Sequence, residues 1–343
     1  MPAVLFRCDG GPELGMGHLM RCRALAAEFA ALGWNCAFAV TKATAALLAD
    51  ATTIVVPAGL DGARAVAEST TPFDCLVVDH YGLDANFETA ARGRTPVVLV
   101  IDDLADRPHA CDVLIDPNPG RTEADYAGLV PRHARFLLGP QYALLRREFV
   151  ERRPAEERPP RRQAGRLLIT FGGADPDNMS ERALQALQHL SPTTIQTTLV
   201  IGPANRHRER LTALANRLGV QVAIDPPDLA ALMLQADMAI ASASTSCWEL
   251  ACLGVPGLLV VTADNQRPTA RAAQQAGTAV VLGGSDHLDA QSLAAAIASL
   301  ASDEASRGGM SAAGRKLVDG RGAARVATAV AELVAAKQQE NRS

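Results

Sequence analysis

The sequence has few aromatic residues, no paired cysteine motif and no long apolar run. Aromatic side chains make up 4% of the residues, and the seven cysteines stand singly, without a CxxC pair. This odd, unpaired set argues against a disulfide framework and indicates small core residues in a reducing compartment. No run of about 18 apolar residues occurs, and no basic segment precedes the first apolar run. We therefore expect a cytoplasmic protein without membrane insertion.

The sequence also lacks an excess of positive charge. The formal net charge is −4 at pH 7, and the isoelectric point is near 6.0. This balance argues against nucleic acid and anionic membranes as partners. A hydrophobic share of 48% and a charged share of 20% are ordinary for a globular protein. The length of 343 residues exceeds the usual size of one domain, so two domains are expected.

A charged segment divides the sequence into two similar halves. Residues 151–165 interleave arginines, glutamates and prolines, which predicts a solvated joint, with a phosphate-binding arginine patch as the alternative. In residues 1–150 and 166–343, short apolar runs alternate with helical patterns. This alternation predicts an α/β fold with a parallel sheet in each domain, and a ligand cleft beyond the carboxyl ends of the strands. The last predicted helix, 322–337, has an apolar stripe that fits against either domain.

The segment GMGHLMRC, residues 15–22, follows the first predicted strand and opens a helix. Gly15 and Gly17 lack side chains, which permits positive φ angles and close approach of a ligand to the backbone. Free amides at the start of a helix attract negative charge. His18 stands among these amides, which makes it the candidate general base. The alternative is a tight turn with a surface histidine.

No cofactor or metal is expected. The dinucleotide fingerprint GxGxxG requires glycine where Met20 stands, and residues 35–42 lack the acidic residue that binds a ribose hydroxyl. Asp102 and Asp103 follow a predicted strand as an acidic pair. Without histidines at metal-ligand spacing nearby, this pair favours helix capping or loop hydrogen bonds over a metal site.

The second domain begins with a glycine turn that is a candidate anion site. Gly172 and Gly173 follow its first predicted strand and precede a helix, a geometry that binds phosphate. The turn is not a Walker loop, because no Gly-Lys-Ser or Gly-Lys-Thr follows. The alternative is a plain turn in which Asp175 or Asp177 bonds backbone amides.

A serine-rich turn later in the same domain is a second candidate. Ser244, Thr245 and Ser246 follow a predicted strand and lead into a helix that contains Glu249. The spacing of Ser246 and Glu249 fits a capping box. In the functional alternative, the hydroxyls and amides hold a diphosphate, and the Glu249 carboxylate accepts both hydroxyls of a ribose.

Polar side chains at two further strand ends complete the candidates. Asp79, His80 and Tyr81 lie at the end of a predicted strand, where Tyr81 is either a ligand contact or a half-buried core tyrosine. Asn265 begins a helix after another apolar strand. Its side-chain amide either forms hydrogen bonds with sugar hydroxyls or caps that helix.

Together these motifs resemble the UDP-2,4-diacetamido-2,4,6-trideoxy-β-L-altropyranose hydrolases of the pseudaminic acid pathway, which are relatives of the MurG-type glycosyltransferases. The resemblance runs along most of the chain, through residues 7–9, 15–21, 79–81, 101–109, 138–146, 171–175, 244–249 and 265–266. The first and third of these motifs are the more specific for the hydrolases. The serine-rich motif is shared with the transferases, and it departs from their pattern at Ala243, where relatives such as MurG have glycine.

The resemblance implies a GT-B arrangement, in which two Rossmann-like domains with parallel sheets face each other across a cleft. It implies that His18 is the catalytic residue. The residues implied on the sugar side are Asp9, Gly17, Arg21, Tyr81 and Asn265. The residues implied to bind the nucleotide are Gly172, Gly173, Ser244, Thr245, Ser246 and Glu249. The implied reaction is attack of water on the anomeric carbon of a UDP-sugar with inversion, in pseudaminic acid biosynthesis for flagellin or surface glycans, without metal or cofactor.

Two other functions fit the same features. A MurG-like glycosyltransferase needs an acceptor, and enzymes with membrane acceptors usually expose an apolar patch rimmed by basic residues, which the first domain lacks. A nucleotide-sugar binding module keeps Gly172 and Glu249 but does not need His18. In all three cases the predicted partner is a small UDP-sugar, and no particular oligomeric state is predicted.

Overall fold

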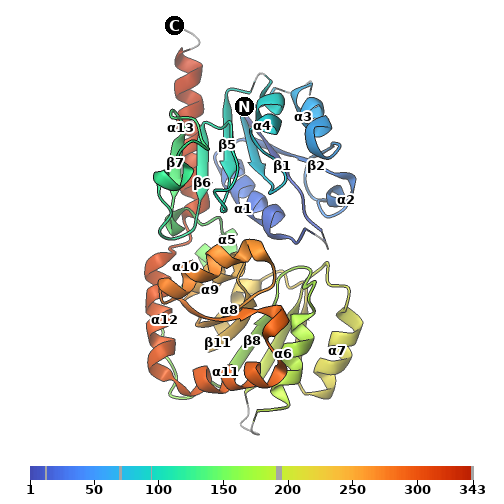
Figure 1. Cartoon of the computed structure of the whole chain (residues 1–343), viewed down its shortest axis with the longest axis vertical. Helices are drawn as coiled ribbons and strands as arrows, with labels where there is room; N and C mark the ends of the chain where they lie inside the picture. Colours follow the sequence, from blue (N-terminus) through green and yellow to red (C-terminus); the bar gives the residue numbers. More distant parts are fainter. Residues whose placement is uncertain (12–13, 69–71, 94, 191–194, 341–343) are drawn as a thin grey trace. The chain divides into compact units, whose positions relative to one another are not determined.

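The computed structural model describes residues 1–11, 14–68, 72–93, 95–190 and 195–340. The chain forms two compact units, each with its own sheet (Figure 1). Unit 1 comprises Met1–Arg146 and Arg321–Ser343, and unit 2 comprises Arg147–Gly320. Within the described ranges, no helix has both the length and the apolarity needed to cross a membrane.

Unit 1 is built on a seven-stranded parallel sheet with the order β3-β2-β1-β4-β5-β6-β7. Its strands are β1 (Ala3–Cys8), β2 (Asn35–Val40), β3 (Thr53–Val55), β4 (Cys75–Asp79), β5 (Val97–Ile101), β6 (Val113–Asp116) and β7 (Arg135–Leu138). The strands β1, β4 and β5 are buried along their whole length, as expected of apolar runs covered on both faces. The strand order reverses between β1 and β4, and open α/β sheets bind ligands at such a switch point.

Helices cover both faces of this sheet. Those of unit 1 are α1 (Gly17–Ala31), α2 (Lys42–Ala45), α3 (Gly59–Ala67), α4 (Ala85–Arg92) and α13 (Gly322–Glu340), with the short 3₁₀ helices η1 (Glu123–Tyr126) and η2 (Pro140–Tyr142). Apolar side chains of α1 and α13 join one buried cluster with Phe6 and Phe38 of the sheet. Those of α3 and α4 join a second cluster with Leu76 and Val98, whose side chains point to the opposite face.

The final helix belongs to unit 1. Val326 and Val334 of α13 are buried in the same cluster as Phe29 of α1. The observed division therefore differs from the expected C-terminal domain, 166–343, because the apolar stripe of α13 packs with α1 rather than on the second sheet. In Figure 1 this helix is drawn in red within unit 1, far along the colour bar from the blue and green segments around it.

Unit 2 repeats the architecture with a six-stranded parallel sheet of order β10-β9-β8-β11-β12-β13. Its strands are β8 (Arg166–Thr170), β9 (Gln196–Ile201), β10 (Gln221–Ile224), β11 (Met238–Ser242), β12 (Gly257–Val261) and β13 (Ala279–Gly284). Its helices are α5 (Arg147–Glu151), α6 (Met179–Leu187), α7 (Arg208–Arg217), α8 (Leu229–Gln235), α9 (Thr245–Leu253), α10 (Arg267–Gln275), α11 (Ala290–Ser302) and α12 (Glu304–Leu317), with η3 (Asp264–Gln266) and η4 (Ser285–His287).

The segment expected to be a joint, 151–165, lies within unit 2. Arg153 Nη2 donates a hydrogen bond of 2.6 Å to the Arg315 carbonyl, and Arg307 Nη2 donates to the Arg161 carbonyl. Hydrogen bonds of this kind, from arginine side chains to backbone carbonyls, tie this polar segment to α12.

Candidate active site

His18 and Asp79 meet at the switch point of the unit 1 sheet. The helix α1 begins at Gly17, so His18 stands in its first turn. Asp79 is the last residue of β4 and is in register with Cys8 of β1. The His18 Nδ1 and Asp79 Oδ1 atoms are 2.6 Å apart, and the exposed fractions of the two residues are 6% and 0%. The strand order thus brings a histidine and a carboxylate into a short, buried contact.

The turn between β1 and α1 depends on glycine. Gly15 has a φ of +76°, a conformation that other residues rarely adopt, and its carbonyl accepts a hydrogen bond of 3.0 Å from the Gly11 amide. Gly17 is exposed at the first position of α1. Met16, at the N-cap, makes no side-chain capping hydrogen bond, so it does not satisfy the first amides of α1.

Arg21 holds the acidic side chains of the site together. Its Nη2 and Nε atoms donate to the two oxygens of Asp79 at 2.7 and 3.0 Å, and its Nη1 atom donates to Asp103 Oδ2 at 2.6 Å. Burial by itself raises the pKa of Asp79, but Arg21 and His18 beside it lower that pKa to about 2. Asp79 is therefore ionised at neutral pH, and Arg21, expected to contact the sugar, is engaged by carboxylates of its own chain.

The ionised Asp79 fixes the state of the His18 ring. A carboxylate only accepts hydrogen bonds, so the 2.6 Å contact requires a proton on His18 Nδ1. In the neutral ring, Nε2 is then the acceptor. Within the described part of the chain, Nε2 makes no hydrogen bond. An imidazole whose Nδ1–H is held by a carboxylate and whose Nε2 accepts is the arrangement of a general base.

Tyr81 packs directly against His18. The two ring centroids are 4.4 Å apart in an edge-to-face arrangement, and the Tyr81 hydroxyl donates to Asp103 Oδ2 at 3.3 Å. Asp103 therefore links Tyr81 to Arg21, and Arg21 in turn contacts Asp79. The structure thus brings together three of the residues that the resemblance implies for the site, His18, Arg21 and Tyr81.

The Asp9 carboxylate accepts hydrogen bonds from neighbouring parts of the chain and does not face solvent. It is 2% exposed. Its Oδ1 atom accepts from the Thr41 amide at 2.8 Å and from the Thr44 hydroxyl at 3.0 Å, while Oδ2 accepts from Arg7 Nη1 at 2.7 Å. Burial raises the pKa of Asp9, yet Thr41 and Arg7 lower it below its ordinary value. Both oxygens are thus engaged by the chain itself, because β1 ends beside the start of α2.

The glycine turn of unit 2 leads into a helix whose start already holds a carboxylate. Gly172 has a φ of +74°. Asp175 is buried, and its two oxygens accept from the Met179 and Ser180 amides at 2.8 and 3.0 Å. This is the capped turn that the sequence offered as the alternative. A phosphate near Gly173 consequently has no access to these two amides of α6.

The serine-rich turn has no such cap. The N-cap of α9 is Ser244, which makes no side-chain capping hydrogen bond; its hydroxyl lies 2.9 Å from that of Ser242. Ser246 lies inside the helix, so the capping-box interpretation of Ser246 and Glu249 is wrong. Because Ala241 of β11 pairs with Thr170 of β8, the two turns follow neighbouring strand ends in unit 2.

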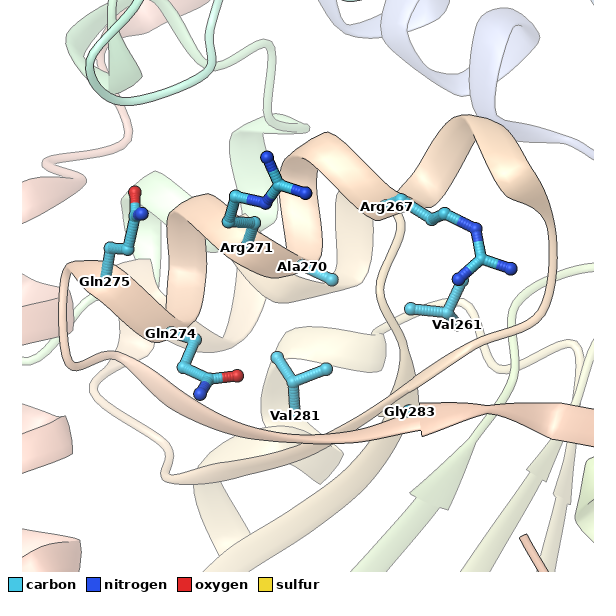
Figure 2. A pocket seen from close by; sticks show the side chains of 8 residues that line it. All are labelled: Val261, Arg267, Ala270, Arg271, Gln274, Gln275, Val281 and Gly283. Carbon is cyan, nitrogen blue, oxygen red and sulfur yellow. The ribbon is translucent and has the colours of Figure 1, made fainter. Parts of the chain in front are cut away.

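Asn265 lies in η3, after β12, and is half-buried. The neighbouring Gln266 Oε1 accepts a hydrogen bond of 3.0 Å from the Thr262 amide, which fixes this turn. An open pocket of about 660 Å³ lies between α10 and β13 (Figure 2). Its lining residues are Val261, Arg267, Ala270, Arg271, Gln274, Gln275, Val281 and Gly283. Asn265 is not among them.

Comparison with known proteins gives two informative relatives, although no family model matches the chain. The chain is 28% identical over 273 residues to the UDP-2,4-diacetamido-2,4,6-trideoxy-β-L-altropyranose hydrolase of Campylobacter jejuni, covering 78% of this chain and 94% of that protein. It is 25% identical over 331 residues to the spore coat polysaccharide biosynthesis protein SpsG of Bacillus subtilis, covering 95% of this chain and 96% of that one. The resemblance indicated by the motifs is therefore confirmed.

Similarity to solved structures identifies the fold of the chain. The chain superposes on MurG of Acinetobacter baumannii with a TM-score of 0.66 and 16% identity, covering 97% of this chain and 100% of that one. It superposes on LpCGTa in complex with UDP with a TM-score of 0.65 and 13% identity, covering 96% and 99%. The chain has the GT-B fold. The two parallel sheets of the GT-B chain confirm the expected fold class.

Two residues of this candidate site were missed by the sequence analysis. Asp79 was noted at a strand end but given no role, and Asp103 was assigned to capping or loop hydrogen bonds. Both residues are acidic and lie at or just after the end of an apolar strand: Asp79 is the last residue of β4, and Asp103 follows β5 by two residues. This position is the sequence signal that could have identified them. The residues that each aspartate contacts depend on the order of the strands in the sheet, which the sequence does not show.

Proposed function

We propose that this chain is an enzyme that hydrolyses a UDP-linked sugar, releasing UDP and the free sugar. The observation that carries the proposal is the 2.6 Å contact between His18 Nδ1 and the ionised Asp79, which leaves Nε2 as an acceptor beside a half-buried tyrosine. Similarity to the Campylobacter jejuni hydrolase over 94% of that protein's length supports the same reaction type.

In the proposed step, the oxygen of a water molecule bonds to the anomeric carbon while the bond from that carbon to the diphosphate oxygen breaks. UDP leaves with the electron pair, and the configuration inverts. The proton of the water passes to His18 Nε2, and the negative charge of Asp79 stabilises the imidazolium that forms. His18 is the catalytic residue, and Tyr81 and Asn265 are proposed as contacts on the sugar side.

The nucleotide is assigned to unit 2. The first amides of α9 have no side-chain cap, so the helix start at Ser244, Thr245 and Ser246 suits the diphosphate. Glu249, buried in the same helix, suits the two ribose hydroxyls. We assign the diphosphate to this turn rather than to the start of α6, where Asp175 already occupies the amides.

The proposed sugar is a diacetamido-trideoxy hexose, and the proposed setting is pseudaminic acid biosynthesis in the cytoplasm, for flagellin or surface glycans. The name of the Campylobacter jejuni relative supports this substrate. The Bacillus subtilis relative is named for spore coat polysaccharide biosynthesis, which makes sugars of that polysaccharide the second group to test.

Incubation of the protein with a panel of UDP-sugars in oxygen-18 water tests the proposal. Mass spectrometry is expected to find the label in the free sugar and not in UDP, because the carbon–oxygen bond breaks. A glycosyltransferase releases little free sugar without an acceptor, and a binding module binds UDP-sugar without turnover. Either result, or label in UDP, contradicts the proposal.

A further inference from the structure

A second buried network lies behind the candidate site of unit 1. Asp116, the last residue of β6, is fully buried. Its Oδ1 atom accepts from the Asn118 amide at 2.8 Å, and its Oδ2 atom accepts from Arg121 Nε at 2.5 Å and from the Tyr126 hydroxyl at 2.9 Å. All three donors come from the segment directly after β6, so one carboxylate organises that whole segment.

The same segment also donates hydrogen bonds to the backbone carbonyl of Asp103. Arg121 Nη2 donates to the Asp103 carbonyl at 2.9 Å, and Asn118 Nδ2 donates to the same carbonyl at 3.1 Å. The Tyr126 hydroxyl also lies 3.0 Å from the Asp102 carbonyl. The Asp103 carbonyl is therefore held by two side chains of the segment that Asp116 organises, and the Tyr126 hydroxyl lies within hydrogen-bond distance of both Asp116 and the Asp102 carbonyl.

We propose that Asp116, Arg121 and Tyr126 form a clamp that positions Asp103, and through it Arg21 and Tyr81, for catalysis. This inference rests on the proposed hydrolysis. The clamp residues are positioning residues: Asp103 transmits their effect, because its side chain accepts from both Arg21 and Tyr81. Arg21 then holds Asp79 against His18.

The charges around Asp116 make the clamp sensitive to pH. Burial raises the pKa of Asp116 to about 6, although the Asn118 amide and Arg121 lower it, and the nearby Asp103 carboxylate raises it further. Arg121 stacks beside the Tyr126 ring, with its guanidinium carbon 5.9 Å from the ring centroid. Well above about pH 6 the charged carboxylate holds Arg121, and well below about pH 6 the added proton removes that charge.

The test compares Asp116→Asn and Tyr126→Phe with Asp112→Asn. Asp112 flanks the opposite end of β6 and is also buried, at 5% exposed against 0% for Asp116, with Arg92 and Lys337 as partners. Turnover of the UDP-sugar is measured from about pH 5 to pH 8, and UDP affinity is measured by calorimetry. Near pH 8, kcat is expected to fall about 10-fold in both clamp variants with UDP affinity unchanged, while Asp112→Asn keeps the wild-type kcat.

The pH dependence separates positioning from a general loss of structure. The ratio of wild-type kcat to Asp116→Asn kcat is expected to shrink toward one below about pH 6, because the wild-type carboxyl is then protonated as well. A ratio near one throughout, or a constant ratio across this range, overturns the clamp. If Asp116→Asn does not fold, Tyr126→Phe, which removes one oxygen atom, still decides the kcat prediction.

A readout without substrate distinguishes failure of the clamp from failure of the proposed hydrolysis. The ¹⁵N NMR signals of His18 report the proton on Nδ1, and His18→Gln identifies them. They are expected to shift in Tyr126→Phe and to stay in place in Asp112→Asn. If no UDP-sugar is hydrolysed but the signals shift, the clamp stands without the proposed reaction; if hydrolysis occurs and neither kcat nor the signals change, the clamp is refuted.

Discussion

Replacing Asp79 by asparagine is the most direct perturbation of the proposed chemistry. The substitution keeps the size of the side chain but removes the negative charge that holds the His18 Nδ1 proton at 2.6 Å. An asparagine amide also offers donors, so the ring is no longer held in the state whose Nε2 accepts a proton. We expect a large loss of kcat with little change in UDP affinity, because the nucleotide is assigned to unit 2.

The size of this loss is bracketed by two considerations. Arg21 and His18 lower the pKa of Asp79 from 3.8 to about 2 against the opposing effect of burial, so the charged carboxylate is stabilised by about 2 kcal/mol. If Asp79 stabilises the imidazolium by an amount of the same order, its loss lowers kcat by nearly 10²-fold. Loss of the aspartate that orients a catalytic histidine in serine proteases costs about 10⁴-fold in kcat. We therefore expect kcat to fall about 10²- to 10⁴-fold, equivalent to about 3–5 kcal/mol.

The assay is release of UDP by purified wild type, Asp79→Asn, His18→Ala and the double variant, with UDP affinity measured in parallel. Because Asp79 acts through His18, the double variant is expected to be no slower than His18→Ala alone. Losses that add up in the double variant refute the orienting role of Asp79. A single Asp79→Asn variant with wild-type kcat and intact folding refutes it as well.

His18→Ala is expected to abolish UDP release while leaving UDP affinity within about threefold of wild type, and undiminished turnover rules out His18 as the base. Because the folded-state pKa of Asp79 is lowered to about 2, the stability it contributes is present above about pH 4 and is lost as pH falls toward 2. Urea unfolding should show this loss of about 2 kcal/mol in wild type but not in Asp79→Asn, and equal pH slopes for the two proteins contradict it. Glu249→Gln is expected to weaken UDP binding about 10-fold, because an amide oxygen accepts less strongly than a carboxylate, and to weaken 2′-deoxy-UDP binding less. Equal losses for both nucleotides exclude a ribose contact.

Local features of the site follow from the sequence. A glycine turn between an apolar strand and an amphipathic helix predicts that His18 opens α1, and the structure confirms that position. The alternation of strands and helices likewise predicts two parallel sheets, as observed. These features depend only on neighbouring residues, whose spacing the sequence displays.

Features that depend on strand order or on packing do not follow from the sequence. Asp79 reaches His18 only because β4 pairs with β1, and spacing along the chain does not state which parallel strands are neighbours. The serine-rich turn shows a finer limit. Ser244 adopts the extended N-cap conformation, so α9 begins before Ser246 and the spacing that fits a capping box is not used.

Because α13 is the last helix of the chain but packs in unit 1, the two units become complete at different times during synthesis. Every residue of unit 2 leaves the ribosome before α13 does, whereas unit 1 waits for α13 to complete one face of its sheet. Nascent unit 1 therefore presents an uncovered apolar surface beside α1 throughout translation of unit 2. We therefore expect unit 1, most of which is made first, to finish folding last, and chaperone demand to concentrate there.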